Sequence, residues 1–203
     1  MMYRPSARVW AAEAAPGAVM TVAVAKTRLR IDAADEDTAV ADYVSAATSH
    51  VEKTTQRLLV ARTCTLRLPA FPPAGVAIEL PGGRVASVTS VTWRDEDGET
   101  QTLAPSRYEV HGDSPARLML TDNEGWPVTA GQGLPVTVTY VAGWPPVGQD
   151  FGANVPEPLR TAVAILAGEM FEQRRESVVG ATVTAAALGA AALIAPWRIR
   201  AAG

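Results

Sequence analysis

The residues able to perform chemistry are few and stand far apart in this sequence. The chain holds two histidines, His50 and His111, and one cysteine, Cys64. Zinc sites use His and Cys ligands at short spacings, and neither histidine has a cysteine near it. No G-x-S-x-G turn is present for a hydrolase nucleophile, although a triad assembled from distant residues stays open. Cys64 alternates with Leu66 and Leu68, which indicates a buried strand position rather than a reactive thiol.

An acidic run and a glycine pair suggest ion or phosphate binding at first sight. The acidic residues are Asp32, Asp35, Glu36 and Asp37. A calcium loop needs oxygen ligands at alternate positions, a glycine at its sixth position and a glutamate at its twelfth, and this spacing fails. Gly82–Gly83 lacks the lysine of a phosphate loop and precedes strand-like sequence, which favours a hairpin turn. We therefore expect no metal and no cofactor, and we assign the acidic run to a helix N-terminus.

Composition restricts the class of protein. The chain has 203 residues, of which 48% are hydrophobic and 19% charged, as in a folded globular protein. A net charge of −3 argues against a general nucleic-acid surface, which needs clustered Lys and Arg. One cysteine excludes an internal disulfide and fits a reducing compartment. No stretch approaches the ~20 apolar residues that span a bilayer, and no signal-peptide core is visible, so we expect a soluble protein made in the cytoplasm, with no membrane partner.

Helical periodicity marks both sides of a central region. A short helix is predicted from Thr21 to Arg30, with Thr21 as its N-cap. A longer helix is predicted over Asp35–Leu59, and a third over Pro156–Glu176, where two early prolines suit the first turn. The apolar positions of the two longer helices are Val40, Tyr43, Val44, Ala47, Val51, Leu58, Leu159, Val163, Leu166 and Met170. His50 lies beside this stripe and is predicted to be a packing or boundary residue.

Between these helices the period changes from helical to alternating. Strands are predicted at Thr63–Leu68, Val76–Leu80, Val85–Trp93, Gln101–Leu103, Tyr108–Val110, Arg117–Leu120 and Val136–Val141. About six or seven short strands at even spacing indicate an antiparallel sandwich or a small barrel-like sheet. The fold class is therefore α+β, with a helical scaffold from the N- and C-terminal segments and an inserted antiparallel β domain.

The segment after Glu176 differs from the rest. It contains no acid, its only charges are Arg198 and Arg200, and a helix is predicted over Thr184–Ala195. A segment this apolar is expected to dock onto something, with Trp197 as an interface anchor. The predicted docking residues are Leu188, Leu193, Ile194, Trp197, Arg198, Ile199 and Arg200.

Several motifs occur in the order found in one family. They are L-R-I-D-A-A-D-E-D-T at Leu29–Thr38, the strand region from Leu80 to Leu103, Y-V-A-G-W-P at Tyr140–Pro145, V-P-E-P-L-R-T-A at Val155–Ala162 and E-Q-R-R-E at Glu172–Glu176. In this order the chain resembles the head–tail connector (adaptor) proteins of long-tailed phages and gene transfer agents. The resemblance covers about Thr21 to Glu176, where each motif alone is a weak pattern.

This resemblance implies a structural function in a particle neck. Such a protein forms a ring, of twelve subunits in the family, between the portal protein and a tail-side stopper or neck protein, and double-stranded DNA passes through the lumen. Arg174 and Arg175 complement a helix C-terminus, or in a ring line the lumen or a subunit contact. The alternatives are a hydrolase encoded in a phage operon and a β-domain binding module.

The expected organisation follows from these patterns. Residues 1–20 form an N-terminal arm, 21–60 with 154–176 a helical connector core, 61–153 the inserted β domain, and 177–203 a docking tail that meets the portal.

Overall fold

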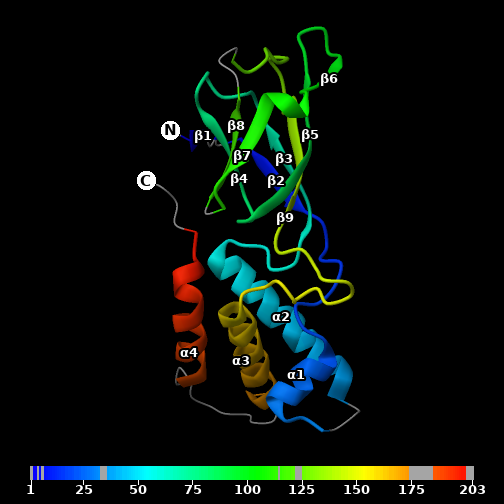
Figure 1. Cartoon of the computed structure of the whole chain (residues 1–203), viewed down its shortest axis with the longest axis vertical. Coiled ribbons are helices and arrows are strands. Elements are labelled where there is room, and N and C mark those ends of the chain that lie inside the picture. The colour runs from blue at the N-terminus through cyan, green and yellow to red at the C-terminus, as the bar shows by residue number, and fades with distance from the viewer. Residues whose placement is uncertain are drawn as a thin grey trace. The chain divides into compact units, whose positions relative to one another are not determined.

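The computed structural model describes residues 2–3, 5, 7–32, 36–113, 115–121, 125–173 and 185–199. The chain forms two compact units, each built from two separate segments (Figure 1). The β unit comprises Met1–Ala14 and Ala61–Gly143, and the helical unit comprises Ala15–Val60 and Trp144–Gly203. The fold class is mixed α+β. The predicted border between residues 60 and 61 is observed, whereas residues 1–14 join the β unit and residues 144–153 join the helical unit.

The β unit contains two sheets. The larger is entirely antiparallel in the order β2-β3-β9-β5-β6, and the smaller has the order β1-β4-β8-β7, with only the β1–β4 pair parallel. The strands are β1 (Met2–Tyr3), β2 (Val9–Ala12), β3 (Arg62–Leu68), β4 (Ala77–Leu80), β5 (Val85–Arg94), β6 (Thr100–Thr102), β7 (Tyr108–His111), β8 (Ala116–Leu120) and β9 (Val136–Ala142), with the short 3-10 helix η2 (Pro105–Arg107) before β7.

Strict alternation in β3 and β9 builds the interior of the larger sheet. Opposite residues are Cys64 with Tyr140, Leu66 with Val138, and Leu68 with Val136, and all six are buried. The predicted buried position of Cys64 is confirmed. The N-terminal strand β2 was not predicted; it adds to the edge of this sheet through β3.

The Tyr140 hydroxyl holds three segments of the β unit together. The indole N–H of Trp10 on β2 donates to it at 2.9 Å, and the hydroxyl donates to the Pro81 carbonyl at 2.8 Å. Tyr140 is fully buried, and this burial raises the pKa of its hydroxyl far above the ordinary value. The hydroxyl is therefore a neutral, structural group.

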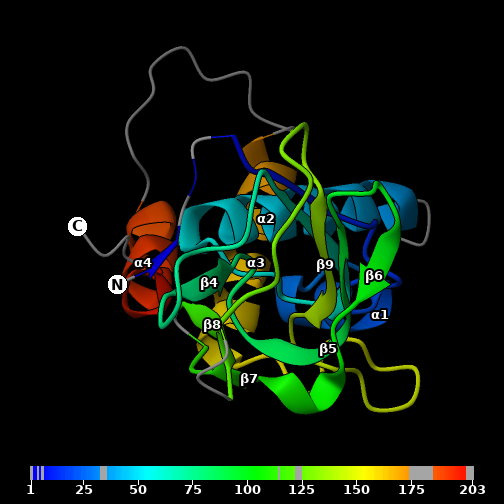
Figure 2. The same cartoon turned by 90° about the horizontal axis from the view of Figure 1, so that it is seen from above.

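The helical unit contains α1 (Val22–Leu29), α2 (Asp37–Thr55), α3 (Glu157–Gln173), α4 (Ala185–Ile194) and the 3-10 helix η3 (Ala195–Trp197) (Figure 2). The predicted N-cap is confirmed, since the Thr21 hydroxyl accepts from the Val24 N–H at 3.3 Å. The first two helices end at Arg30 and Gln56, which adopt the left-handed conformation that closes a helix.

The core of the helical unit lies between α2, α3 and α4. Its buried members include Val40, Val44, Ala47, Val51, Leu159, Ala162, Val163, Ala167, Ala190 and Ile194. Gly168 permits a close approach of α1, because a Cβ there would meet Leu29 Cδ2 at 2.6 Å. Gly152 permits another, since a Cβ there would lie 1.8 Å from the Val19 carbonyl oxygen. Leu166, predicted as a member of the buried stripe, is only partly buried.

Candidate interaction surfaces

The side chains able to perform chemistry lie on separate elements. His50, predicted to be a packing or boundary residue, is exposed on α2 and does not pack in the core, and Cys64 is buried in β3. On β7, His111 Nε2 lies 2.6 Å from Glu109 Oε1. In the part of the chain that the structure describes, no three His, Cys, Asp or Glu residues are placed to hold a metal ion. Nor does any helix in those residues have the length and apolar character needed to cross a bilayer.

The acidic run contributes to helix packing. Asp37 lies in the first turn of α2, and its Oδ1 is 2.6 Å from Lys26 Nζ on α1. Glu36 occupies the N-cap position without a side-chain cap bond, and Asp35 lies outside the described residues. The ion pair joins α1 to α2, so the carboxylate of Asp37 already has a cationic partner.

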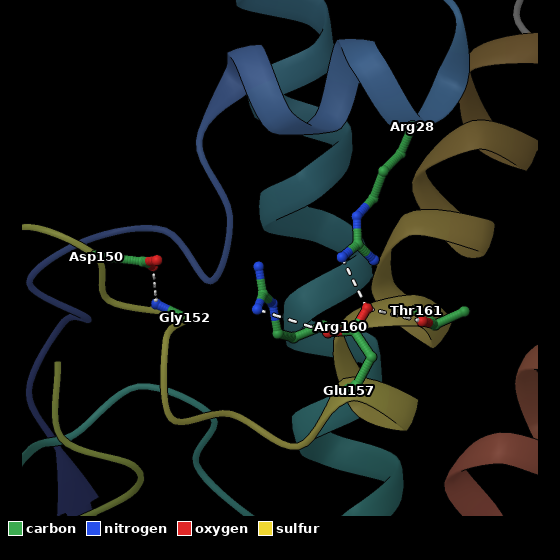
Figure 3. Close-up of polar contacts among 6 residues, drawn as sticks. All are labelled: Arg28, Asp150, Gly152, Glu157, Arg160 and Thr161. Carbon is green, nitrogen blue, oxygen red and sulfur yellow. Dashed lines mark hydrogen bonds and ion pairs between the residues drawn. The ribbon is translucent and has the colours of Figure 1, made fainter. Parts of the chain in front are cut away.

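A second charged group joins α1 to the N-terminus of α3 (Figure 3). Glu157 Oε1 accepts from Arg28 Nη2 at 2.7 Å and from the Thr161 hydroxyl at 3.4 Å. Arg160 Nη1 lies 3.6 Å from the other carboxylate oxygen. The hydrogen bond from Arg28 lowers the pKa of Glu157, which supports an ionised carboxylate at the positive end of the α3 dipole.

The loop preceding α3 is fixed by its own polar contact. The Gly152 N–H donates to Asp150 Oδ1 at 2.9 Å in a local turn (Figure 3). The Asn154 amide donates to the Pro145 carbonyl at 2.9 Å. These two contacts fix the loop that leads into α3.

The C-terminal segment packs on the chain's own helices. The ring of Trp197 lies edge-on to Trp144, with 6.3 Å between the ring centroids, and its carbonyl accepts from Arg57 Nε at 2.7 Å. The Ile199 N–H donates to the carbonyl of Thr55 at 3.0 Å and so satisfies an acceptor at the end of α2. Trp144 is buried in the helical core, so its ring fixes the loop that precedes α3.

This packing decides which predicted docking residues are available to a partner. Ile194 is buried, and Leu193, Trp197 and Ile199 are half-buried against the helical unit. Leu188 is 61% exposed and Arg198 is exposed. Arg174, Arg175 and Arg200 lie outside the described residues. Of the predicted docking residues that the structure describes, Leu188 and Arg198 are therefore the exposed ones.

Exposed apolar side chains mark further surfaces. In the helical unit they are Val24, Val147 and Leu188, and in the β unit Val9, Trp10 and Val128. Val24 was not singled out from the sequence, although the helical spacing of Val22, Ala25 and Leu29 places it on the opposite face of that helix.

An aromatic group lies in the β unit near Val128. Phe71 stacks on Trp126 with centroids 4.9 Å apart and meets the edge of Trp93 at 5.9 Å. Trp126 Nε1 donates to the Val76 carbonyl at 3.4 Å. Trp126 is therefore half-buried and structural, whereas Val128 in the same loop is 67% exposed.

The fold is similar to that of chains from gene transfer agent particles. One chain of an empty gene transfer agent neck, determined with C6 symmetry, is 27% identical to this protein with a TM-score of 0.76, covering 96% of this chain and 98% of that one. A chain of the native gene transfer agent virion is also 27% identical, with a TM-score of 0.74 and coverage of 96% and 97%.

A third similarity concerns the fold alone. A chain of a native gene transfer agent neck, determined with C12 symmetry, is 24% identical with a TM-score of 0.70, covering 95% of this chain and 98% of that one. No protein-family model and no curated protein sequence matches the chain. The resemblance to head–tail connectors seen in the sequence is thus confirmed by solved neck structures of nearly the same length.

Proposed function

We propose that this protein is a structural head–tail adaptor in the neck of a gene transfer agent or tailed-phage particle. In this function it forms a ring between the portal and the tail-side neck proteins, and DNA passes through the lumen. Its activity is assembly, and the contacts between subunits and partners take the place of a catalytic site.

One observation carries the proposal. The structural match with a neck chain, at 27% identity, covers 96% of this protein and 98% of that chain. An agreement limited to the β unit would favour a shared module that serves many functions. Here both units, in the same interrupted chain order, are matched.

Charge is compatible with the passage of DNA. The chain carries a net charge of −3. A ring of many copies would therefore not bind the DNA phosphates strongly, because strong binding needs cations that displace the counterions of DNA. The described part of the C-terminal segment exposes Arg198, which would be attracted to an acidic portal surface.

Deletion of the gene tests the proposal. Particles made without the protein are expected to accumulate as DNA-filled heads that lack tails, and supplying the full chain in trans is expected to restore tails. Electron microscopy of the restored particles should show density for this protein at the neck. Normal tailed particles in the deletion strain would overturn the proposal and favour the enzyme or the binding module.

A further inference from the structure

The helical unit presents an apolar outer face on α4. This helix has no polar side chain, although its buried residues Ala190 and Ile194 occupy only one side of it. Leu188, Ala191 and Ala192 are exposed on the other side. A helix that is apolar all round is normally covered all round, so this face lacks a partner within the described chain.

A second apolar face lies on α1. Ala25 is buried against the core, whereas Ala23 and Val24 are exposed, and the hydroxyl of the exposed Thr27 donates to the Ala23 carbonyl at 2.9 Å. In the helical unit, α1 and α4 lie on opposite sides with α3 between them, as Figures 1 and 2 agree. Val24 and Leu188 are the large apolar side chains most exposed on the helices of this unit.

The charges of α1 do not oppose an apolar partner. Lys26 is paired with Asp37 at 2.6 Å, and Arg28 with Glu157 at 2.7 Å. Covering the α1 face therefore buries cations that already have partners, which avoids the large penalty of an isolated buried charge. An uncharged helix such as α4 is suited to this surface.

Cyclic symmetry selects the partner. The similar neck structures have C6 and C12 symmetry, and a closed ring uses two different patches on opposite sides of every subunit. We propose that the Leu188 face of α4 in one copy packs on the Val24 face of α1 in the next copy. This inference rests on the proposed function and assigns the subunit contact of the ring to these two helices.

Cysteine cross-linking tests the contact. The full chain is made as Val24→Cys, as Leu188→Cys and as the double variant, and Cys64 is buried and gives little background. Oxidation of purified particle necks, and of the concentrated purified chain, is followed on non-reducing gels. The double variant is expected to give a ladder of dimers, trimers and larger species, whereas each single variant stays monomeric. The control pairs Leu188→Cys with Ser49→Cys, an exposed position on α2, and should give no ladder.

Three results would overturn the inference. They are the absence of a ladder in both samples, a ladder only with the Ser49 control, and cross-linking of Leu188→Cys to itself or to a different protein. The proposed function is judged separately, by the presence of the protein in the necks. A neck that contains the protein, with no ladder in either sample, refutes only this inference, and a ladder from the purified chain with no protein in necks refutes only the adaptor function.

A rescue experiment separates contact from stability. Leu188→Glu is expected to abolish the oligomer while leaving the thermal midpoint of the subunit unchanged, because the side chain is mostly exposed. Adding Val24→Lys to the same chain should restore at least half of the oligomer, since each glutamate would then face a lysine of the next copy. Failure of the second change to restore it would contradict the proposed pairing.

Discussion

Tyr140→Phe should destabilise the β unit without changing its packed volume. The substitution removes the acceptor of the Trp10 indole at 2.9 Å and the donor to the Pro81 carbonyl at 2.8 Å. Each lost hydrogen bond costs about 0.5–1.5 kcal/mol, and a buried group left without a partner adds to this. Trp10 is 38% exposed, so water can reach its N–H, and we expect a total loss of about 2 kcal/mol. For a chain of this length that loss lowers the thermal midpoint by roughly 4–8 °C.

The same substitution has a signature at high pH. Burial keeps the folded-state pKa of Tyr140 above that of the unfolded chain, which is near 10. The stability due to the neutral buried hydroxyl is therefore complete below about pH 10 and declines as the pH rises further. The decline is at most about 1.4 kcal/mol per pH unit for one proton. The phenylalanine variant has no such proton, so the difference from wild type should narrow above pH 10.

Urea unfolding followed by tryptophan fluorescence and circular dichroism, at pH 7 and from pH 9.5 to 11, measures both effects. Tyr43→Phe is the control, because Tyr43 is half-buried and its ring keeps the edge contact with Phe171. The control should change the free energy of unfolding by less than about 0.5 kcal/mol. Equal stability of wild type and Tyr140→Phe at pH 7, or a difference that stays constant to pH 11, would refute the assigned network.

Three further changes test the helical unit. Gly152→Ala should lower stability by at least about 1–3 kcal/mol, since its Cβ would lie 1.8 Å from the Val19 carbonyl; an unchanged melting temperature contradicts this. Ile194→Ala should cost about 2–5 kcal/mol in the isolated subunit, whereas Leu188→Ala should be nearly neutral; equal effects would mean that the tail is not part of the subunit core. Glu157→Gln should cost under about 1 kcal/mol at pH 7 because the pair is exposed. The lowered pKa makes this contribution complete above about pH 4.3, and the difference in urea midpoints should vanish as the pH falls further; a difference that persists at pH 2 counts against the ion pair.

Elements with a strong local period could be predicted from the sequence. The helix predicted over Thr184–Ala195 is observed as α4 at Ala185–Ile194, and the strand predicted at Thr63–Leu68 is observed as β3 at Arg62–Leu68. In both segments the side-chain pattern itself sets the conformation. The longer helix predicted to Leu59 ends at Thr55, because Gln56 adopts the left-handed conformation. No glycine or proline stands at this position to indicate the helix end from the sequence.

Features that depend on distant contacts could not be predicted. The strand at Val9–Ala12 is short and mostly exposed, and it exists because it pairs with β3 and because Trp10 reaches Tyr140. The C-terminal segment was expected to dock onto another protein, because its composition does not indicate which surface buries it. Its residues instead meet Arg57 and Thr55 at the end of α2, about 140 positions earlier in the chain.

The interrupted order of the two units has a consequence for synthesis on the ribosome. All segments of the β unit have been translated once Gly143 has emerged, whereas the helical unit still lacks α3, α4 and the Ile199 contact with Thr55. Until then α1 and α2 can contact only each other, because α3, which packs on both of them in the folded unit, has not been made. A nascent chain therefore carries a foldable β unit joined to helices that cannot yet close their core. Chaperones that bind exposed apolar helices are expected to engage the chain during this interval and to leave when α4 packs.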